Sequence, residues 1–297
     1  MNQYFLKYNG REIKYVVAEH TNELKNVLSE GTKIYYKKDA YPVVHSGAFI
    51  ETLKMSLSDS DYEVLSLPDA MEGLELTTSV FIPRSISEMT DGDLLKEFGV
   101  VFCTMDVFND MNPRFYYSQI TSLMRVACMK DAAYYEWLID HSYDFLDKDL
   151  GFLFEAIDEC GKYLSFFFEK YPKDEWHKYL DYSNLIEEIL KDVVTDSEVE
   201  EYEMRALALV ANAHLSYQHN RISLEEYLEI RDMMVPFHQP ITIESLSLAT
   251  LDKYFSNDEG MKISVMRHLG KLCFNDIITR SEMENAINEL YFEETND

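Results

Sequence analysis

Short runs of β-branched and aromatic residues dominate the first hundred positions of the chain. Four of them have the length and composition of strands, namely residues 5–9, 11–20, 33–38 and 62–68. Between these runs, residues 20–30 and 46–58 place leucine, valine, isoleucine and methionine at helical spacing. A chain that alternates strand and helix in this way predicts a partly parallel sheet with crossover connections.

The rest of the chain has apolar residues at helical spacing with few interruptions. The expected helices cover residues 115–129, 131–146, 151–170, 183–194, 198–219, 223–234 and 281–292. Two of them begin with a capping box, in which a serine and a glutamate each bond a free backbone N–H group. These pairs are Ser223 with Glu226 and Ser281 with Glu284. Residues 261–276 interrupt the helical pattern and predict a small β-hairpin.

The change of pattern predicts two domains. Residues 1–110 are expected to form a truncated α/β domain with a partly parallel sheet, and residues 111–297 a mainly helical, all-α domain. Both patterns break over residues 82–98, which we take as the junction.

Composition excludes several classes of protein. The formal net charge of −27 disfavours nucleic acid as a partner, because phosphates are bound by clustered lysine and arginine. A DNA mimic and a protein with a basic partner are the alternatives that this charge leaves open. No run is apolar and long enough for a membrane span, and the N-terminus lacks the apolar segment of a secretory signal. The four cysteines are far apart, which is typical of buried thiols in a cytoplasmic protein.

Residues 102–138, FCTMDVFNDMNPRFYYSQITSLMRVACMKDAAYYEWL, carry the most informative pattern. The segment resembles, without a gap, the stretch of 3-dehydroquinate synthases that contains a glutamate metal ligand and a nearby lysine. Ser122 stands at the glutamate position and Arg125 at the lysine position. Three further segments resemble the same family in the same order, namely residues 62–80, 206–234 and 260–290.

This resemblance implies a fold and a reaction. Members of the family have an N-terminal α/β domain that binds NAD and a C-terminal helical domain that holds zinc or cobalt, with the substrate between them. They make 3-dehydroquinate from a phosphorylated sugar acid by transient oxidation, phosphate elimination, reduction and ring closure. Relatives cyclise other sugar phosphates.

The residues that bind the cofactor in the family are not matched here. A glycine-rich turn lets backbone N–H groups approach the pyrophosphate, but no two of the ten glycines in this chain are adjacent. Asp69 remains from the family's turn after the strand at 62–68, and Asp39 is the second residual acid. These two aspartates do not make a cofactor site, and we expect no NAD.

The family's metal ligands are also replaced. Asn184 and Glu188 fall at two histidine positions and Glu201 at a third, with Ser122 at the glutamate position. This set is poor for zinc, which prefers three nitrogen or oxygen ligands and an open position. A weak site for a hard cation at Glu188 and Glu201 is the alternative, because such cations accept carboxylates. We expect no metal.

Three hypotheses about function follow. The first is a pseudoenzyme that acts as a binding or regulatory subunit, as a homodimer or as a heterodimer with an active homologue. The second is an NAD-independent enzyme or binder of a sugar phosphate, in which Arg125 holds the phosphate. The third is an acidic interaction protein with an unrelated basic partner. The fourth interpretation is an active 3-dehydroquinate synthase of the shikimate pathway. The replaced cofactor and metal residues argue against it.

Overall fold

The computed structural model describes residues 1–8, 11–20, 23, 33–37, 54–57, 62–66, 79–81, 100–109, 111–171, 182–255 and 260–291. The chain forms two compact units. The first comprises Met1–Tyr116 and Tyr143–Trp176, and the second comprises Tyr117–Ser142 and His177–Asp297. None of the helices in the described ranges is long and apolar enough to cross a membrane.

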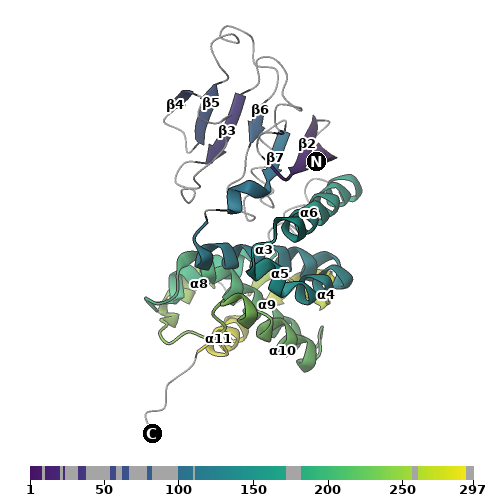
Figure 1. The fold of residues 1–297 in the computed structure, drawn as a ribbon. Helices are drawn as coiled ribbons and strands as arrows, with labels where there is room; N and C mark the ends of the chain where they lie inside the picture. The colour runs from purple at the N-terminus through teal and green to yellow at the C-terminus, as the bar shows by residue number, and fades with distance from the viewer. Residues whose placement is uncertain are drawn as a thin grey trace. The chain divides into compact units, whose positions relative to one another are not determined.

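A mixed sheet is the basis of the first unit (Figure 1). Its strands are β1 (Asn2–Tyr8), β2 (Arg11–Ala18), β3 (Lys33–Lys37), β4 (Lys54–Leu57), β5 (Tyr62–Ser66), β6 (Ser79–Phe81) and β7 (Val100–Thr104). They lie in the order β1-β2-β7-β6-β3-β5-β4. The inner strands β2, β7, β6 and β3 run parallel, whereas β1, β5 and β4 are antiparallel to their neighbours. The prediction of a partly parallel sheet is confirmed for these strands.

The prediction of a helix over residues 46–58 is wrong at its C-terminal end. Residues Lys54–Leu57, expected to be helical, form β4 and pair antiparallel to β5. Short apolar runs fit either structure, and pairing with a neighbouring strand decides between them. The remainder of residues 46–58 lies outside the described residues, as does the expected helix over residues 20–30 apart from Glu23.

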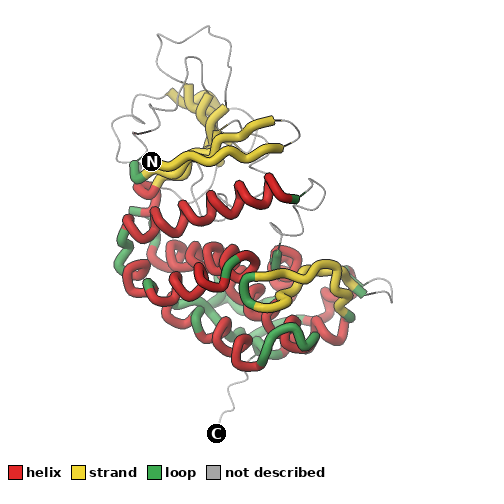
Figure 2. The backbone as a smooth tube through the Cα atoms, turned by 90° about the vertical axis from the view of Figure 1, so that its right-hand side faces the viewer, coloured by secondary structure: helices red, strands yellow, loops and turns green. Residues whose placement is uncertain are grey.

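Helix α6 (Leu150–Lys170), which follows the short α5 (Ser142–Leu146), packs on β1 and β2 (Figure 2). Gly161 lies at the closest approach, where a Cβ atom would be 2.8 Å from Cδ2 of Tyr4 and 3.0 Å from ring atoms of Tyr15. Glycine therefore stands inside this helix despite its cost in helix propensity. The Tyr4 hydroxyl donates a hydrogen bond to Oδ1 of Asp158, which also ties β1 to α6.

Helix α9 is the core of the second unit. The other helices described beyond β7 are α3 (Pro113–Lys130), α4 (Ala132–Asp140), α8 (Asn184–Val193), α10 (Leu224–Asp232) and α11 (Arg280–Asn288). Short 3₁₀ turns occur at η3 (Met105–Phe108), η5 (Glu201–Glu203), η6 (Val235–Phe237) and η7 (Leu248–Lys253). Helix α9 (Met204–Gln218) packs against α8, α10, α11 and β8, and most of its residues are buried. A helix that is apolar on every side is expected in a core.

The predicted hairpin is confirmed as β8 (Met261–His268) and β9 (Lys271–Ile278), drawn in yellow within the helical unit in Figure 2. Two polar residues of α9 satisfy backbone groups of β8. Asn212 Nδ2 donates to the Ser264 carbonyl over 2.9 Å, and Ser216 Oγ accepts from the Met266 N–H over 3.0 Å. These bonds attach the hairpin to α9, because buried backbone groups need partners.

One of the two predicted capping boxes is confirmed and the other is wrong. Ser223 and Glu226 bond each other's backbone N–H groups at the start of α10. At α11 the box is formed two residues earlier than expected, by Thr279 and Glu282, and not by Ser281 and Glu284. Strand β9 ends immediately before Thr279, so the helix begins at the first suitable residue. Glu284 pairs instead with Arg280.

Candidate functional site

A chain of polar contacts links α3, α8 and the start of α9. Arg205 Nη1 donates to the hydroxyl of the buried Ser122 over 2.8 Å. Arg205 Nε donates to Oε2 of Glu187 over 2.9 Å. The other oxygen of Glu187, Oε1, lies 3.2 Å from Nζ of Lys191. One buried carboxylate therefore bridges two cations, and we call Ser122, Glu187, Lys191 and Arg205 the Arg205 cluster.

Two exposed glutamates extend this cluster into solvent. Lys191 Nζ lies 3.0 Å from Oε1 of Glu188 and 3.7 Å from Oε1 of Glu201. The side chains of Glu188 and Glu201 are 63% and 81% exposed. Pairs this exposed are screened by water and contribute little to stability. The energetic centre of the site is therefore the contact between Glu187 and Arg205.

Local structure positions these side chains. Glu187 and Lys191 are four residues apart in α8, a spacing that places a glutamate and a lysine on the same helix face. Arg205 lies in the first turn of α9, directly after η5. The buried Glu203 accepts the Glu200 N–H over 2.9 Å in a capping box, which orients this turn.

The electrostatics agree with an ionised cluster. Burial raises the pKa of Glu187, but Arg205 and Lys191 outweigh burial and hold this pKa below its ordinary value. Burial lowers the pKa of Lys191, but Glu187 and Glu188 outweigh it and hold this pKa above its ordinary value. Both shifts stabilise the charged forms, so Glu187 and Lys191 are ionised at neutral pH.

The other predicted site residues are placed as follows. Arg125 lies one helical turn after Ser122, is only 2% exposed, and its Nη1 donates to the Tyr182 carbonyl over 3.3 Å. Asn184 is the first residue of α8, and its Oδ1 is buried with no hydrogen-bond partner among the described residues. Asp39 and Asp69 lie outside the described residues.

Three residues of the cluster were missed in the sequence: Glu187, Lys191 and Arg205. The spacing of Glu187 and Lys191 was a usable signal, because it is the preferred order of an ion pair on one helix face. Arg205 gave no local signal, since its partner Ser122 lies 83 residues away in the chain. Of the predicted positions, Ser122, Glu188 and Glu201 are brought into one connected set of contacts.

Comparison with known proteins places the fold. No protein-family model matches the sequence, and no curated protein matches it. The structure is similar to ValA (2-epi-5-epi-valiolone synthase) from Streptomyces hygroscopicus subsp. jinggangensis 5008 with NAD+ and Zn2+ bound, with a TM-score of 0.58 and 14% identity. That match covers 72% of this chain and 66% of the valiolone synthase.

A second similar structure is 2-deoxy-scyllo-inosose synthase complexed with carbaglucose-6-phosphate, NAD+ and Co2+. Its TM-score is 0.66 at 11% identity, over 97% of this chain and 100% of the synthase chain. Another structure of 2-deoxy-scyllo-inosose synthase has a TM-score of 0.52 at 11% identity, over 72% of this chain and 66% of the synthase. The chain thus has a fold similar to that of sugar phosphate cyclases, the class to which these enzymes belong.

The Arg205 cluster does not fit the divalent metals, Zn2+ and Co2+, that two of these similar structures contain. Within the described ranges, no group of three or more histidine, cysteine, aspartate or glutamate side chains could hold a metal ion. The carboxylate of Glu187 is already bonded by a guanidinium and an ammonium. Both cations would repel a metal at short range, and neither can serve as a ligand while charged. The cluster is instead suited to join three helices through compensated charge.

Proposed function

We propose that the chain keeps the fold of a sugar phosphate cyclase without the reaction, and acts as a binding or regulatory subunit. The observation that carries this proposal is the contact of Arg205 with both Ser122 and Glu187. Ser122 stands where the resemblance to 3-dehydroquinate synthases places a glutamate ligand. Its hydroxyl accepts a hydrogen bond from a guanidinium, so a permanent cation contacts the position of a former ligand.

The chemistry of the side chains supports this proposal. A catalytic zinc or cobalt site needs ligands with a free lone pair and an open position for the substrate. Arginine is always protonated, has no lone pair to offer and occupies space beside Ser122 and Glu187. The sequence has neither adjacent glycines nor a G-x-G spacing, so it lacks the usual glycine-rich cradle for the NAD pyrophosphate. The metal step and the hydride step are thus opposed by independent features.

The partner that we propose is a second copy of this chain or an active homologue with the same fold. A degenerate chain of this kind would contribute binding surface and leave turnover to its partner. The net charge of −27 makes nucleic acid an unsuitable partner. A basic protein unrelated to the fold is the alternative that a strong dependence of the complex on salt would favour.

An enzyme or binder that acts on a sugar phosphate through Arg125 is less well supported. Arg125 is 2% exposed, and its guanidinium donates to the Tyr182 carbonyl. A phosphate would have to reach this buried group from solvent. Calorimetric titration with a sugar phosphate tests this alternative. Saturable binding that Arg125→Ala abolishes would favour the alternative over the pseudoenzyme.

The decisive experiment is a 3-dehydroquinate synthase turnover assay with NAD and zinc. The purified chain is assayed alone and after mixing with an active synthase from its own host. We expect no product from the chain alone and a changed rate of the active enzyme on mixing. Product from the chain alone would overturn the proposal. An unchanged rate on mixing would reject an active synthase as the partner.

A further inference from the structure

Strand β1 lies at one end of the sheet in the first unit, and β4 lies at the other. Each end strand pairs with a single neighbour among the described strands, so backbone groups on its outer edge have no strand partner there. Strand β4 has four residues, whereas β1 has seven and pairs with β2 without a break from Asn2 to Tyr8. The longer strand is therefore the end at which a further strand can add to the sheet.

Strand β1 lacks the features with which proteins protect a free strand edge. Such features are proline, a β-bulge, a very short strand or charged residues along the edge. The sequence of β1, NQYFLKY, contains no proline and only one charged residue, Lys7, and its pairing with β2 shows no shift of register. An edge strand of this kind is typical of a site that pairs with another chain.

Apolar side chains are exposed beside this edge. Met1 and Phe5 are each 42% exposed, and Gln3 between them is exposed as well. Tyr4 points instead toward α6, where its hydroxyl bonds Asp158. Because successive side chains of a strand alternate between its two faces, Gln3 and Phe5 lie on the face that α6 does not cover.

A contact with α6 leaves the backbone of β1 able to pair. Ser165 Oγ donates to the Phe5 carbonyl over 3.4 Å, which is long for a hydrogen bond from a hydroxyl group. A carbonyl oxygen has two lone pairs, so this oxygen can still accept an N–H group from a further strand.

The charge of the chain favours a second copy as the partner at this edge. Residues 1–18 contain three basic residues and one acidic residue, a formal charge of +2 in a chain of −27. Two copies that meet at β1 place the positive charge of both N-terminal hairpins between two negative bodies, whereas a contact between acidic surfaces is repulsive. An antiparallel pair of identical strands also obeys a two-fold axis, so one surface serves both copies.

We propose that β1 pairs antiparallel with β1 of a second copy, and that the sheets of the two first units join across this edge. The pairing satisfies outer backbone groups of both strands and covers Phe5 of both copies. The inference rests on the proposed function for its choice of a second copy as partner, and names the surface through which the copies meet. The oligomeric state tests this surface and the turnover assay tests the loss of the reaction, so the two can fail separately.

Sedimentation velocity of the purified chain over a series of dilutions tests the pairing. We expect a dimer that dissociates on dilution. Phe5→Lys places a charge on the edge strand and should be monomeric, with the far-ultraviolet circular dichroism of the native protein. Gln3→Lys is a second variant at an exposed position of the same face and should also weaken the dimer. Tyr143→Lys adds the same charge at an aromatic residue of α5 that is 80% exposed, and should remain a dimer.

Hydrogen exchange identifies the strand that pairs. Amides of β1 should exchange faster in Phe5→Lys than in the native dimer, whereas amides of β2 should keep their protection. The proposal is overturned if the native chain is monomeric at every concentration, or if Phe5→Lys and Gln3→Lys dimerise as tightly as the native chain. Equal weakening by Tyr143→Lys would also overturn it, because the effect would then belong to added charge and not to β1. A dimer broken by Phe5→Lys in a chain that makes product would support the interface and overturn the proposed function.

Discussion

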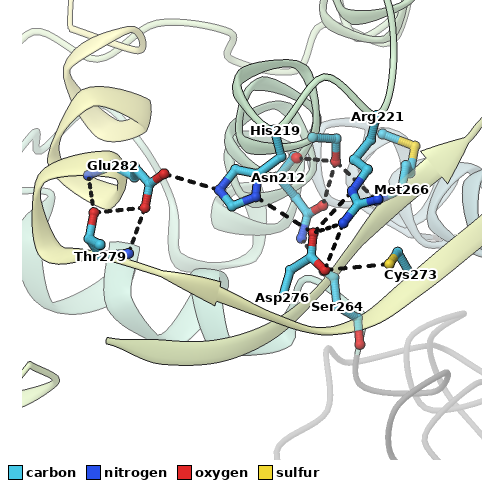
Figure 3. Close-up of polar contacts among 10 residues, drawn as sticks. Asn212, His219, Arg221, Ser264, Met266, Cys273, Asp276, Thr279 and Glu282 are labelled. Atoms are coloured by element: carbon cyan, nitrogen blue, oxygen red, sulfur yellow. Dashed lines mark hydrogen bonds and ion pairs between the residues drawn. The ribbon is translucent and has the colours of Figure 1, made fainter. Parts of the chain in front are cut away.

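The two ends of α9 are attached to neighbouring elements by different basic residues. At the first turn, Arg205 joins α9 to Glu187 of α8 and to Ser122 of α3. At the last turn, His219 joins α9 to Asp276 of β9 and to Glu282 of α11. Arginine remains charged at every physiological pH, whereas histidine changes charge within that range. The first attachment therefore has a permanent cation at its centre, whereas the second has a histidine beside two carboxylates (Figure 3).

The two ends also differ in burial. Glu187 is buried, and its carboxylate depends on Arg205 and Lys191. Asp276 is largely buried, but the Glu282 side chain is 35% exposed and has a second partner in Thr279. An unpaired charge in the interior costs far more free energy than one that water can reach. We therefore expect the larger effects of mutation at the start of α9.

The largest effect is expected for Arg205→Met. The substitution strands the buried carboxylate of Glu187 with only Lys191 and removes the donor to Ser122. Breaking a buried pair by removing one partner costs about 3 kcal/mol of unfolding free energy. Urea denaturation of both proteins measures this loss. Arg205→Lys is the matched control and should lose less, because it keeps the charge. Equal stability of Arg205→Met and the native protein would contradict a dependence of Glu187 on Arg205.

The second effect is a loss of unfolding free energy at acidic pH that depends on Glu187. The pKa of Glu187 is lower in the folded chain than its ordinary value, since Arg205 and Lys191 outweigh burial. Its contribution to stability is therefore present at neutral pH and is lost as the pH falls through the folded-state pKa. Unfolding free energies measured from neutral to acidic pH should fall less steeply for Glu187→Gln than for the native protein. Parallel curves would show that the cluster does not hold this carboxylate ionised.

A smaller net change in stability is expected when Arg205 and Glu187 are both replaced. In Arg205→Met combined with Glu187→Met, no buried charge remains without a partner. Apolar replacement of an entire buried pair is often close to neutral, so the double variant should lie within about 1 kcal/mol of the native protein. A double-mutant cycle in urea checks this. A loss equal to the sum of the single variants would mean that the two residues do not interact.

The smallest effect is expected at the other end, for Arg221→Gln. This arginine bonds both oxygens of Asp276, but its side chain is 39% exposed. Exposed pairs contribute about 0.5 kcal/mol, and His219 remains beside the same carboxylate. Thermal unfolding at neutral pH measures the change. A loss as large as that of Arg205→Met would remove the contrast between the two ends.

Periodicity in the sequence was sufficient for much of the fold. The expected helices match α3, α6, α8, α9 and α10 to within a few residues at most ends, because their apolar residues recur at a helical period. The hairpin at residues 261–276 was predicted because these residues interrupt the helical pattern. Strand β4 was missed because its partner β5, and not its own composition, determines its conformation.

The candidate site was less accessible from the sequence. Ser122, Glu188 and Glu201 were identified by resemblance to a family, which indicates positions in the sequence and not the contacts made there. Arg205 and Lys191 supply those contacts between separate helices. His219 gave no local signal in the sequence, because its two carboxylate partners come from β9 and α11. Contacts of this kind depend on tertiary packing, which local patterns do not contain.

The claim that Arg205 and Lys191, and not a metal ion, compensate the charge of Glu187 is tested most directly by titrating the purified chain with Zn²⁺ and Co²⁺ in a calorimeter. Glu187→Gln and Glu188→Gln serve as matched variants for the buried and the exposed carboxylate. We predict no saturable binding of one metal ion per chain that depends on Glu187, because Arg205 and Lys191 already compensate its charge. Tight binding of one ion per chain that Glu187→Gln abolishes would contradict the account, and would show that the cluster is a metal site after all.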